Sequence, residues 1–293
     1  MSNDLRFRDF IGRRHPEHSK IHILEFPTDH GVYINGGRPG ASKAPELIRA
    51  ALGNLTPHAE HYQKHTDCLE LTQFAGTIPC ENDVEKDQLR LASELSERLK
   101  MGILPVILGG GHETSFGHFL GYAMSEKPVT IINIDAHTDV RSLKNGLPHS
   151  GSPFRQAIEH NSGCCKAYHV FGLNPASVSF IHYQYTKSAG FAYFDHELTA
   201  ALIESKLKEI EGPIMITMDM DALNQAEAPG VSAPNPSGIS KDLWLELAYL
   251  FGKCSNVTSF DLCEVNPLFD RDNQTVKLAA LTIWKFLLGY SMR

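Results

Sequence analysis

Short apolar segments alternate with longer amphipathic segments along most of this 293-residue chain. Apolar runs of about four to eight residues, rich in valine and isoleucine, are typical of strands buried on both faces of a parallel sheet. They predict strands at residues 21–26, 103–108, 129–134, 168–172, 191–194, 213–218 and 257–261. Apolar positions at helical spacing predict helices that begin near residue 44 and that cover 82–100, 198–210, 241–251 and 273–290.

The alternation of strands and helices predicts the fold class. Strands separated by helices form units in which the strands run parallel and the helices cover the sheet. We therefore expect a single α/β domain over residues 1–293, with a mostly parallel central sheet. Residues 1–20 are polar and are expected to form an N-terminal surface arm or a short helix. Segment 228–238 is rich in glycine and proline and is expected to form a rim or lid.

Composition and charge limit the kind of protein. The chain is 42% hydrophobic and 21% charged, which is typical of a globular protein with a sizeable core. A net charge of -7 and a pI near 6.1 provide no basic surface for nucleic acid or an anionic membrane. The sequence contains neither a bilayer-spanning apolar run nor a signal-peptide core. We therefore expect a cytoplasmic protein with its six cysteines reduced.

Acidic residues and a histidine follow the predicted strand 129–134. Asp135, His137 and Asp139 are two positions apart, and residues with this spacing project from one face of an extended backbone. The three side chains can therefore converge on one point. That point lies just beyond the carboxyl end of a strand, where open α/β sheets bind their ligands.

Two other strand ends carry similar side chains. Three glycines at 109–111 let the chain turn sharply after strand 103–108 and bring His112 to the end of the sheet. Asp219 and Asp221 follow strand 213–218, where carboxylates are costly unless they are paired. We expect one site to contain His112, Asp135, His137, Asp139, Asp219 and Asp221.

The charges of this set predict its chemistry. Carboxylates in close proximity repel one another, so they either take up protons or require cations, and two divalent ions would neutralise the four carboxylates. Oxygen donors outnumber nitrogen donors and no thiolate is present, which favours manganese but leaves zinc, iron and cobalt open. Two metal ions roughly 3.5 Å apart would bridge a water molecule and deprotonate it. The predicted reaction class is metal-assisted hydrolysis.

A separate group of histidines precedes the predicted helix 82–100. His58, His61 and His65 are close together in sequence, a pattern that can indicate metal binding. Their neighbours are polar, and no predicted strand orients them. We interpret the three histidines as surface residues.

Four motifs resemble those of the ureohydrolases, the family of arginase and agmatinase. They appear in the family's order as Gly-Gly-Gly-His-Glu at 109–113, Asp-Ala-His-Thr-Asp at 135–139, Met-Asp-Met-Asp-Ala at 218–222 and Ser-Phe-Asp-Leu-Cys-Glu-Val-Asn-Pro at 259–267. The resemblance implies a three-layer α/β/α fold and two Mn²⁺ per subunit, held by the six residues named above. It implies that Asp135 and Asp221 bridge the metals. It also implies that Glu264 contacts the planar C–N group of the substrate and that His149 shuttles protons, although an ordinary loop histidine is the alternative.

The sequence departs from arginase at two places. Arginases carry an asparagine that holds the amino-acid carboxylate, and Arg141 stands at that position. They also carry an Arg-Asp pair that helps to bind a free α-amino group, where this chain has Asn174 and Pro175. Compared with arginase, this chain lacks the aspartate of that pair and gains the guanidinium of Arg141. We therefore expect a substrate that is more negatively charged than the substrate of arginase, with Asn174 as a candidate contact.

Two further segments resemble the formimidoylglutamase branch of the family: Asn-Gly-Gly-Arg-Pro-Gly-Ala at 35–41 and His-Ser-Gly-Ser-Pro-Phe-Arg at 149–155. The substrate of that branch, N-formimidoyl-L-glutamate, has two carboxylates and no free amine. Arginine binds carboxylates through parallel hydrogen bonds, so Arg141 and Arg38 are the candidate contacts. Arg155 is equally consistent with a structural ion pair. The expected products are L-glutamate and formamide, in a step of histidine degradation.

The predicted mechanism begins with attack of a metal-bridging hydroxide on the formimidoyl carbon. Glu264 polarises the amidine, and Asp139 or His149 protonates the leaving nitrogen. The alternatives are another ureohydrolase, such as agmatinase or guanidinobutyrase, and a non-catalytic relative. Arg141 disfavours an amine-tailed substrate, and the full ligand set disfavours a non-catalytic protein. The resemblance implies a homo-oligomer acting on a small molecule.

Overall fold

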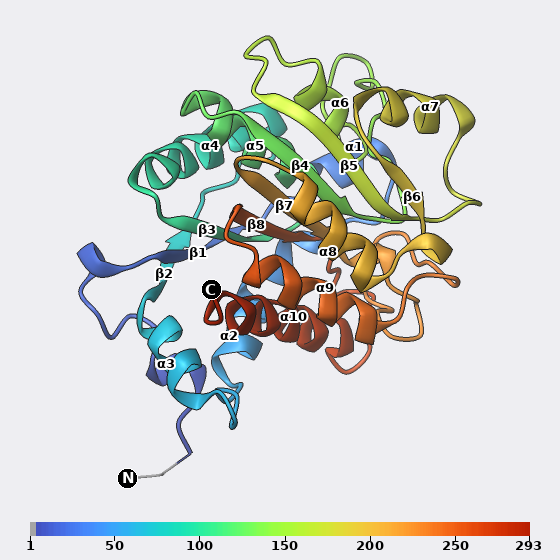
Figure 1. The fold of residues 1–293 in the computed structure, drawn as a ribbon. Helices are drawn as coiled ribbons and strands as arrows, with labels where there is room; N and C mark the ends of the chain where they lie inside the picture. Colours follow the sequence, from blue (N-terminus) through green and yellow to red (C-terminus); the bar gives the residue numbers. More distant parts are fainter. Residues whose placement is uncertain (1–3) are drawn as a thin grey trace.

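Residues 4–293 are described by the computed structural model, and they are built around an eight-stranded sheet (Figure 1). The strand order is β2-β1-β3-β8-β7-β4-β5-β6, and each neighbouring pair is parallel. The strands are β1 (Ile21–Phe26), β2 (Thr72–Thr77), β3 (Leu104–Gly109), β4 (Val129–Ile134), β5 (Cys165–Leu173), β6 (Ala192–Phe194), β7 (Ile214–Asp219) and β8 (Val257–Cys263). The predicted parallel α/β sheet is confirmed.

Helices cover both faces of the sheet and produce three layers (Figure 1). One layer contains α2 (Ala44–Gly53), α3 (Tyr62–Glu70), α8 (Ala200–Glu209), α9 (Lys241–Lys253) and α10 (Gln274–Tyr290). The other contains α4 (Val84–Met101), α5 (Thr114–Met124), α6 (Pro153–Ile158) and α7 (Phe180–Ala189), while α1 (His30–Asn35) lies in the connection after β1. Within residues 4–293, no helix has the length and apolar character needed to cross a bilayer.

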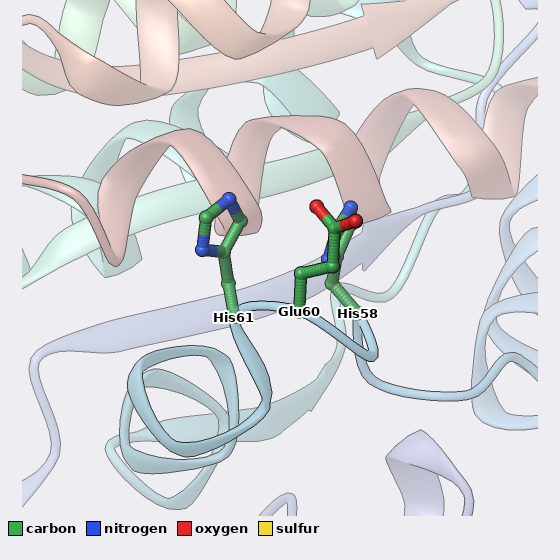
Figure 2. Close-up of side chains that lie close together, drawn as sticks. All are labelled: His58, Glu60 and His61. Carbon is green, nitrogen blue, oxygen red and sulfur yellow. The ribbon is translucent and has the colours of Figure 1, made fainter.

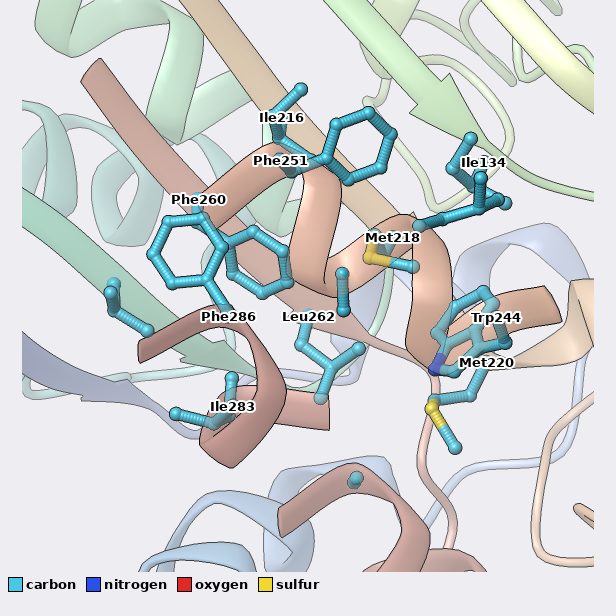
Figure 3. Packing of buried hydrophobic residues seen from close by; sticks show 14 of the residues in the cluster. Ile134, Ile216, Met218, Met220, Trp244, Phe251, Phe260, Leu262, Ile283 and Phe286 are labelled. Carbon is cyan, nitrogen blue, oxygen red and sulfur yellow. The ribbon is translucent and has the colours of Figure 1, made fainter. Parts of the chain in front are cut away.

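Alternating strand residues fill the cores on the two faces of the sheet. On β4, Ile132 and Ile134 belong to the larger core, whereas Ile131 belongs to the core on the opposite face. This alternation follows from the two-residue period of a strand. Figure 3 shows part of the larger core, in which residues of β7 and β8 lie among residues of α9 and α10, including Ile216, Phe260, Trp244, Phe251 and Phe286.

The expectation of a surface arm at residues 1–20 is wrong for part of that segment. Phe7 and Phe10 are buried in the larger core, and the amide of Phe7 donates to the carbonyl oxygen of Leu55 at 2.8 Å. Two isolated aromatic residues among charged ones give no periodic signal in the sequence. Residues 1–3 lie outside the described residues. Single 3-10 turns occur at Phe7–Asp9, Pro16–His18, Ala41–Lys43, Asp195–Glu197 and Met220–Ala222.

Sequence periodicity did not predict β2, α1, α3, α6 and α7. The β2 strand lies at one edge of the sheet and is only partly buried, so it has no continuous apolar run. The α7 helix exposes Phe180 and Ile181, which removes the apolar stripe expected of a helix that covers a sheet. These elements lie at the edges of the fold or in short connections.

Four adjacent strands at the centre of the sheet position the candidate site. They are β3, β8, β7 and β4, and they run parallel. Their carboxyl ends therefore meet at one edge of the sheet, which is where parallel α/β proteins bind ligands.

Candidate metal centre and active site

The six predicted metal ligands lie together at the carboxyl ends of β3, β4 and β7. They form two groups in which the possible ligand atoms lie within 4.8 Å of one another. The first group contains His112, Asp135, Asp139 and Asp219, and the second contains Asp135, His137 and Asp221. Asp135 belongs to both groups and is fully buried, whereas Asp221 belongs to one.

The imidazole of His112 faces three carboxylates through one nitrogen. Its Nδ1 lies 3.0 Å from an oxygen of Asp139, 3.1 Å from Asp219 and 3.3 Å from Asp135. A single ring nitrogen carries at most one proton, so it cannot donate fully to all three oxygens. The arrangement instead resembles ligands grouped around a shared cation.

The other nitrogen of His112 is fixed by a buried hydrogen-bond network. Its Nε2 lies 2.9 Å from Oγ1 of Thr217, and that hydroxyl donates to Asp261 at 2.7 Å. A threonine hydroxyl has one proton, so it must accept from His112 Nε2–H. With the Nε2 proton held by Thr217, Nδ1 is the nitrogen that faces the three carboxylates, and it would be the ligand atom for a metal ion bound among them.

The second group also contains an unsatisfied polar atom that fits a cation. His137 Nδ1 lies 3.1 Å from Asp221 Oδ2 and 3.4 Å from Asp135 Oδ1. The other oxygen of Asp221, Oδ1, is buried and has no hydrogen-bond partner. A buried carboxylate oxygen without a donor is costly, and a metal ion would satisfy it.

Charge interactions shift the pKa of most ligands. The charge of Asp221 raises the pKa of His137. Burial raises the pKa of Asp219 well above its usual range, and the charges of Asp221 and Asp135 add to this. Burial would also raise the pKa of Asp135, but hydrogen bonds from His112 and His137 hold it below its usual range. Without cations, the group must therefore share protons among imidazoles and carboxylates.

Two residues of the site have left-handed backbone conformations. Asp139 has a φ of 45° and Glu264 has a φ of 68°, a region that favours glycine. Backbone strain of this kind persists where the surrounding structure determines the conformation, and it is concentrated at functional sites. These left-handed backbone conformations place the carboxylates of Asp139 and Glu264 beside the cavity.

Glu264 is buried next to a second buried carboxyl group. Its Oε1 accepts a hydrogen bond from the amide of His112 at 2.8 Å, whereas Oε2 has no partner. Burial raises the pKa of Glu264 to about 8, and the charge of Glu113 adds to the effect. Glu113 in turn accepts hydrogen bonds from Gly31 and Thr28, so it anchors the start of α1 beside the site. Glu264 therefore presents a buried carboxyl group at the wall of the neighbouring cavity.

A polar cavity of about 220 Å³ lies over the two groups of ligands. Its volume suits a small molecule rather than a polymer. Its walls come from the end of α1, the ligand strands and loops near residues 150 and 232. The lining residues are Val32, Asn35, Gly36, Gly37, His137, Asp139, Arg141, Ser150, Asp219, Asp221, Ser232, Ala233 and Glu264.

Arg141 lies at the cavity and is held by a residue to which the sequence analysis gave no role. Its Nη1 donates to Oδ1 of Asn35 at 3.1 Å, and Nδ2 of Asn35 donates to Ser150 at 3.1 Å. Among residues 4–293, no carboxylate forms an ion pair with Arg141. Asn35 ends α1, and Gly36 follows with a φ of 87°, which is a common helix end. In the sequence, the Asn-Gly pair at residues 35 and 36 was the signal that could have indicated this helix end.

A family model for the arginase family matches residues 19–289. The chain belongs to the arginase family. Its sequence is 36% identical to a formimidoylglutamase of Geobacillus thermodenitrificans, over 98% of this chain and 89% of that protein. It is 32% identical to a formimidoylglutamase of Rhodococcus jostii, over 90% of this chain and 84% of that protein. This is therefore an arginase-family metallohydrolase that is similar to formimidoylglutamases.

Solved structures show the same fold. Trypanosoma cruzi formiminoglutamase with Mn²⁺ superposes with a TM-score of 0.91 at 28% identity, covering 99% of this chain and 100% of that one. Formimidoylglutamase from Bacillus subtilis gives a TM-score of 0.86 at 26% identity, covering 100% and 94% of the two chains. Arginase from Bacillus subtilis, at 23% identity and a TM-score of 0.77, shares the fold. The predicted arginase-like fold is confirmed.

The structure of this arginase-family chain places His149 away from the cavity lining. His149 is buried in the loop before α6, and its Nε2 lies 3.0 Å from the carbonyl oxygen of Ser142. Its Nδ1 accepts from the amide of Gly151 at 3.1 Å. Burial lowers the pKa of His149. Both ring nitrogens bind main chain, so the geometry does not support the predicted proton shuttle and favours a loop-stabilising role.

Two predicted substrate contacts also lie outside the cavity lining. The guanidinium of Arg38 donates to the carbonyl oxygens of Ser232 and Val231 at 3.0 and 2.6 Å, and it lies over the ring of Phe269. Asn174 donates to Oδ1 of Asn235 at 2.9 Å and lines a different cavity. In the structure these polar groups stabilise the loops around the site, and their contact with a substrate stays a prediction.

Arg155 takes the structural role that the sequence left open. It forms an ion pair with Glu159 at 3.4 Å, donates to the carbonyl oxygen of Val140 at 2.8 Å and lies over the ring of Tyr185. Its guanidinium is therefore engaged within the fold.

Replacing Thr217 with valine is expected to weaken metal binding about 10- to 100-fold, the usual effect of losing a residue that orients a ligand. Valine preserves the shape but neither accepts from His112 nor donates to Asp261. Competition with a chelating dye would measure the affinity. Thr130→Val, a buried substitution on β4 with no hydrogen bond to the centre, is the matched control. Equal affinities for both variants would show that Thr217 does not orient His112.

Proposed function

We propose that this chain hydrolyses N-formimidoyl-L-glutamate to L-glutamate and formamide. The observation that carries the proposal is the position of Arg141. It lies on the cavity that contains the metal ligands, and no acidic side chain among residues 4–293 neutralises it through an ion pair. A guanidinium in this position favours a substrate with a carboxylate and disfavours one with a cationic amine.

Similarity to named relatives supports the same substrate. The curated relatives described above are formimidoylglutamases, and they align with this chain over most of its length. Sequence identities of 36% and 32% are stronger evidence for the family than for the substrate. The proposal therefore depends on the cavity residues as well as on the relatives.

The donor set fits two manganese ions. His112, Asp135, Asp139 and Asp219 would hold one ion, and Asp135, His137 and Asp221 would hold the other. These ligands are mainly carboxylates, which suit manganese. When bound, the ions would supply an activated water nucleophile and stabilise negative charge on the reacting group.

The remaining steps depend on residues of this chain. Arg141 binds a substrate carboxylate and thereby directs the formimidoyl group toward the ligand strands. Glu264 accepts an N–H of the amidine through its free Oε2. Asp139 lines the cavity and would carry a proton to the departing glutamate nitrogen. Water adds to the formimidoyl carbon, the bond from that carbon to the glutamate nitrogen breaks, and formamide is released.

The test is a comparison of four substrates with the manganese-loaded protein. N-Formimidoyl-L-glutamate should be hydrolysed with release of glutamate and formamide, and arginine, agmatine and guanidinobutyrate should react at least about tenfold more slowly in kcat/KM. Chromatography of the products would separate formamide from urea. Preferential release of urea would be consistent with the arginase family but would contradict the proposed substrate, N-formimidoyl-L-glutamate. A homo-oligomeric state and a cytoplasmic location stay predictions from the sequence.

A further inference from the structure

We propose that the turn before α3 binds a transition-metal ion of the zinc type through His58, Glu60 and His61, at a site separate from the catalytic centre. Each of these residues offers one ligand atom, and the three atoms lie within 4.8 Å of one another. Figure 2 shows the three side chains rising from the same side of the turn toward the helix beside it. None of them lines the cavity of the active site.

Among residues 4–293, no side-chain hydrogen bond or ion pair competes for the three ligand groups. Nδ1 of His58 is buried and has no hydrogen-bond partner. Within residues 4–293, the carboxylate of Glu60 forms no salt bridge and the ring of His61 forms no hydrogen bond. A buried nitrogen without a partner is costly, and coordination to a metal ion would satisfy it.

Neighbouring contacts hold the turn in place before any ion binds. Nε1 of Trp284 on α10 donates to the carbonyl oxygen of Thr56 at 2.7 Å. The amide of His58 donates to Nδ1 of the buried His65 at 3.2 Å. The rings of His58 and His61 stack with their centroids 4.9 Å apart. Because these contacts order the turn, metal binding loses less conformational entropy there than in a free loop.

The buried position of His65 corrects the interpretation of all three histidines as surface residues. His65 packs edge-to-face against Phe7 and Trp284, with ring centroids 5.2 and 5.1 Å apart. Burial lowers its pKa to about 4, and His58 and His61 add to that effect. His65 therefore acts as a neutral support that fixes the backbone of His58, and the other two histidines remain available as ligands.

The donor set selects a different class of metal from the catalytic centre. Two imidazoles and one carboxylate are typical zinc ligands, with water in the remaining position. Ions such as nickel and copper also bind imidazole well, whereas manganese and magnesium prefer sites richer in oxygen. The N-terminus of α3, which begins at Tyr62, disfavours a nearby cation, and the charge of Glu60 offsets this effect.

Trp284 provides a direct signal for the site. Its ring centroid lies 5.7 Å from that of His58, and the other tryptophan, Trp244, is buried in the core. Zinc sulfate would be added to manganese-loaded protein, followed by dialysis and measurement of both metals in the same sample. We expect one zinc ion per chain with unchanged manganese, a change in tryptophan fluorescence and a higher Tm.

Two conservative variants and one matched control test the ligands. Glu60→Gln and His61→Gln should each weaken zinc binding about tenfold or more, because each removes a direct ligand, while hydrolysis by the manganese form stays unchanged. His196→Gln removes an exposed histidine that also lies beside a carboxylate, 3.5 Å from Asp195, and should bind zinc like the unmodified chain. Equal zinc binding in His61→Gln and the unmodified chain would overturn the proposal. Zinc uptake that only displaces manganese would also overturn it.

Discussion

Replacing Asp135 with asparagine is expected to abolish hydrolysis and to remove both manganese ions together. Asp135 contributes oxygens to both groups of ligands, and its side chain is fully buried. A neutral amide is a poor ligand compared with a carboxylate, and it removes one of the four negative charges that balance the two ions. Metal content after dialysis and the rate of formamide release should therefore fall together to background.

The same variant should remain folded, which separates loss of metal from loss of structure. Asp135 accepts from the amide of His137 at 2.7 Å, and an asparagine oxygen can keep that bond. Nδ2 of Asn133 now donates to Asp135, but its Oδ1 has no partner among residues 4–293, so rotation of the Asn133 amide can accommodate the new group at the loss of one hydrogen bond, from Nδ2 to Tyr168. Removing a charge also relieves repulsion in the metal-free centre.

Thermal unfolding with and without manganese would test this separation. The Tm of metal-free Asp135→Asn should not fall below that of the metal-free unmodified chain, while the increase on adding manganese should disappear. Asp242→Asn, at a strongly exposed position, should retain activity and both ions. Full activity in Asp135→Asn, or in the unmodified chain after removal of metal, would refute the two-metal proposal.

The grouping of the candidate metal ligands could be predicted from the sequence because each lies at or just beyond the end of a buried strand. Asp135 directly follows a fully buried strand, whereas His137 and Asp139 lie beyond its end, where Asp139 has a φ of 45° and the two-residue spacing of an extended chain no longer holds. Parallel strands then bring their carboxyl ends to one edge without further information. Strand periodicity therefore accounts for the sheet and for the edge at which the cluster lies.

The cavity walls could not be predicted in the same way, because they depend on contacts between distant segments. Arg141 is held by Asn35, and the two residues are 106 positions apart in the sequence. Arg38 donates to main-chain oxygens about 194 positions away, so its charge is used within the fold. A sequence shows that an arginine is present in a loop, but the direction of its guanidinium depends on how loops pack.

Hydrogen bonds to main chain also determine where His149 lies, which the sequence could not show. Its place in the loop after Asp139 was compatible with a proton shuttle, and the resemblance supported that role. The ring instead lies between the carbonyl oxygen of Ser142 and the amide of Gly151. Buried polar groups of a tight loop need partners, and a nearby histidine can supply both a donor and an acceptor.

Replacing Arg141 with glutamine should lower kcat/KM for N-formimidoyl-L-glutamate about 100-fold. Hydrogen bonds to charged groups contribute about 1.5–3 kcal/mol, and each 1.4 kcal/mol corresponds to about tenfold. Most of the loss should appear as a higher KM, because the arginine binds the substrate carboxylate equally in the ground state and the transition state. Steady-state kinetics with the manganese-loaded variant would measure both parameters.

An analogue without the α-carboxylate distinguishes direct binding from a general loss of charge. With N-formimidoyl-4-aminobutyrate, the unmodified chain should be slow, and Arg141→Gln should cause little further loss, because the partner of the guanidinium is already absent. Arg271→Gln removes an equal charge at an exposed position and should change neither substrate's kinetics. If Arg141→Gln lowered kcat/KM for both substrates to the same extent, Arg141 would either bind the γ-carboxylate, which the analogue keeps, or act on the shape of the cavity through Asn35. In the second case the preference for an acidic substrate would have to come from other residues that line the cavity.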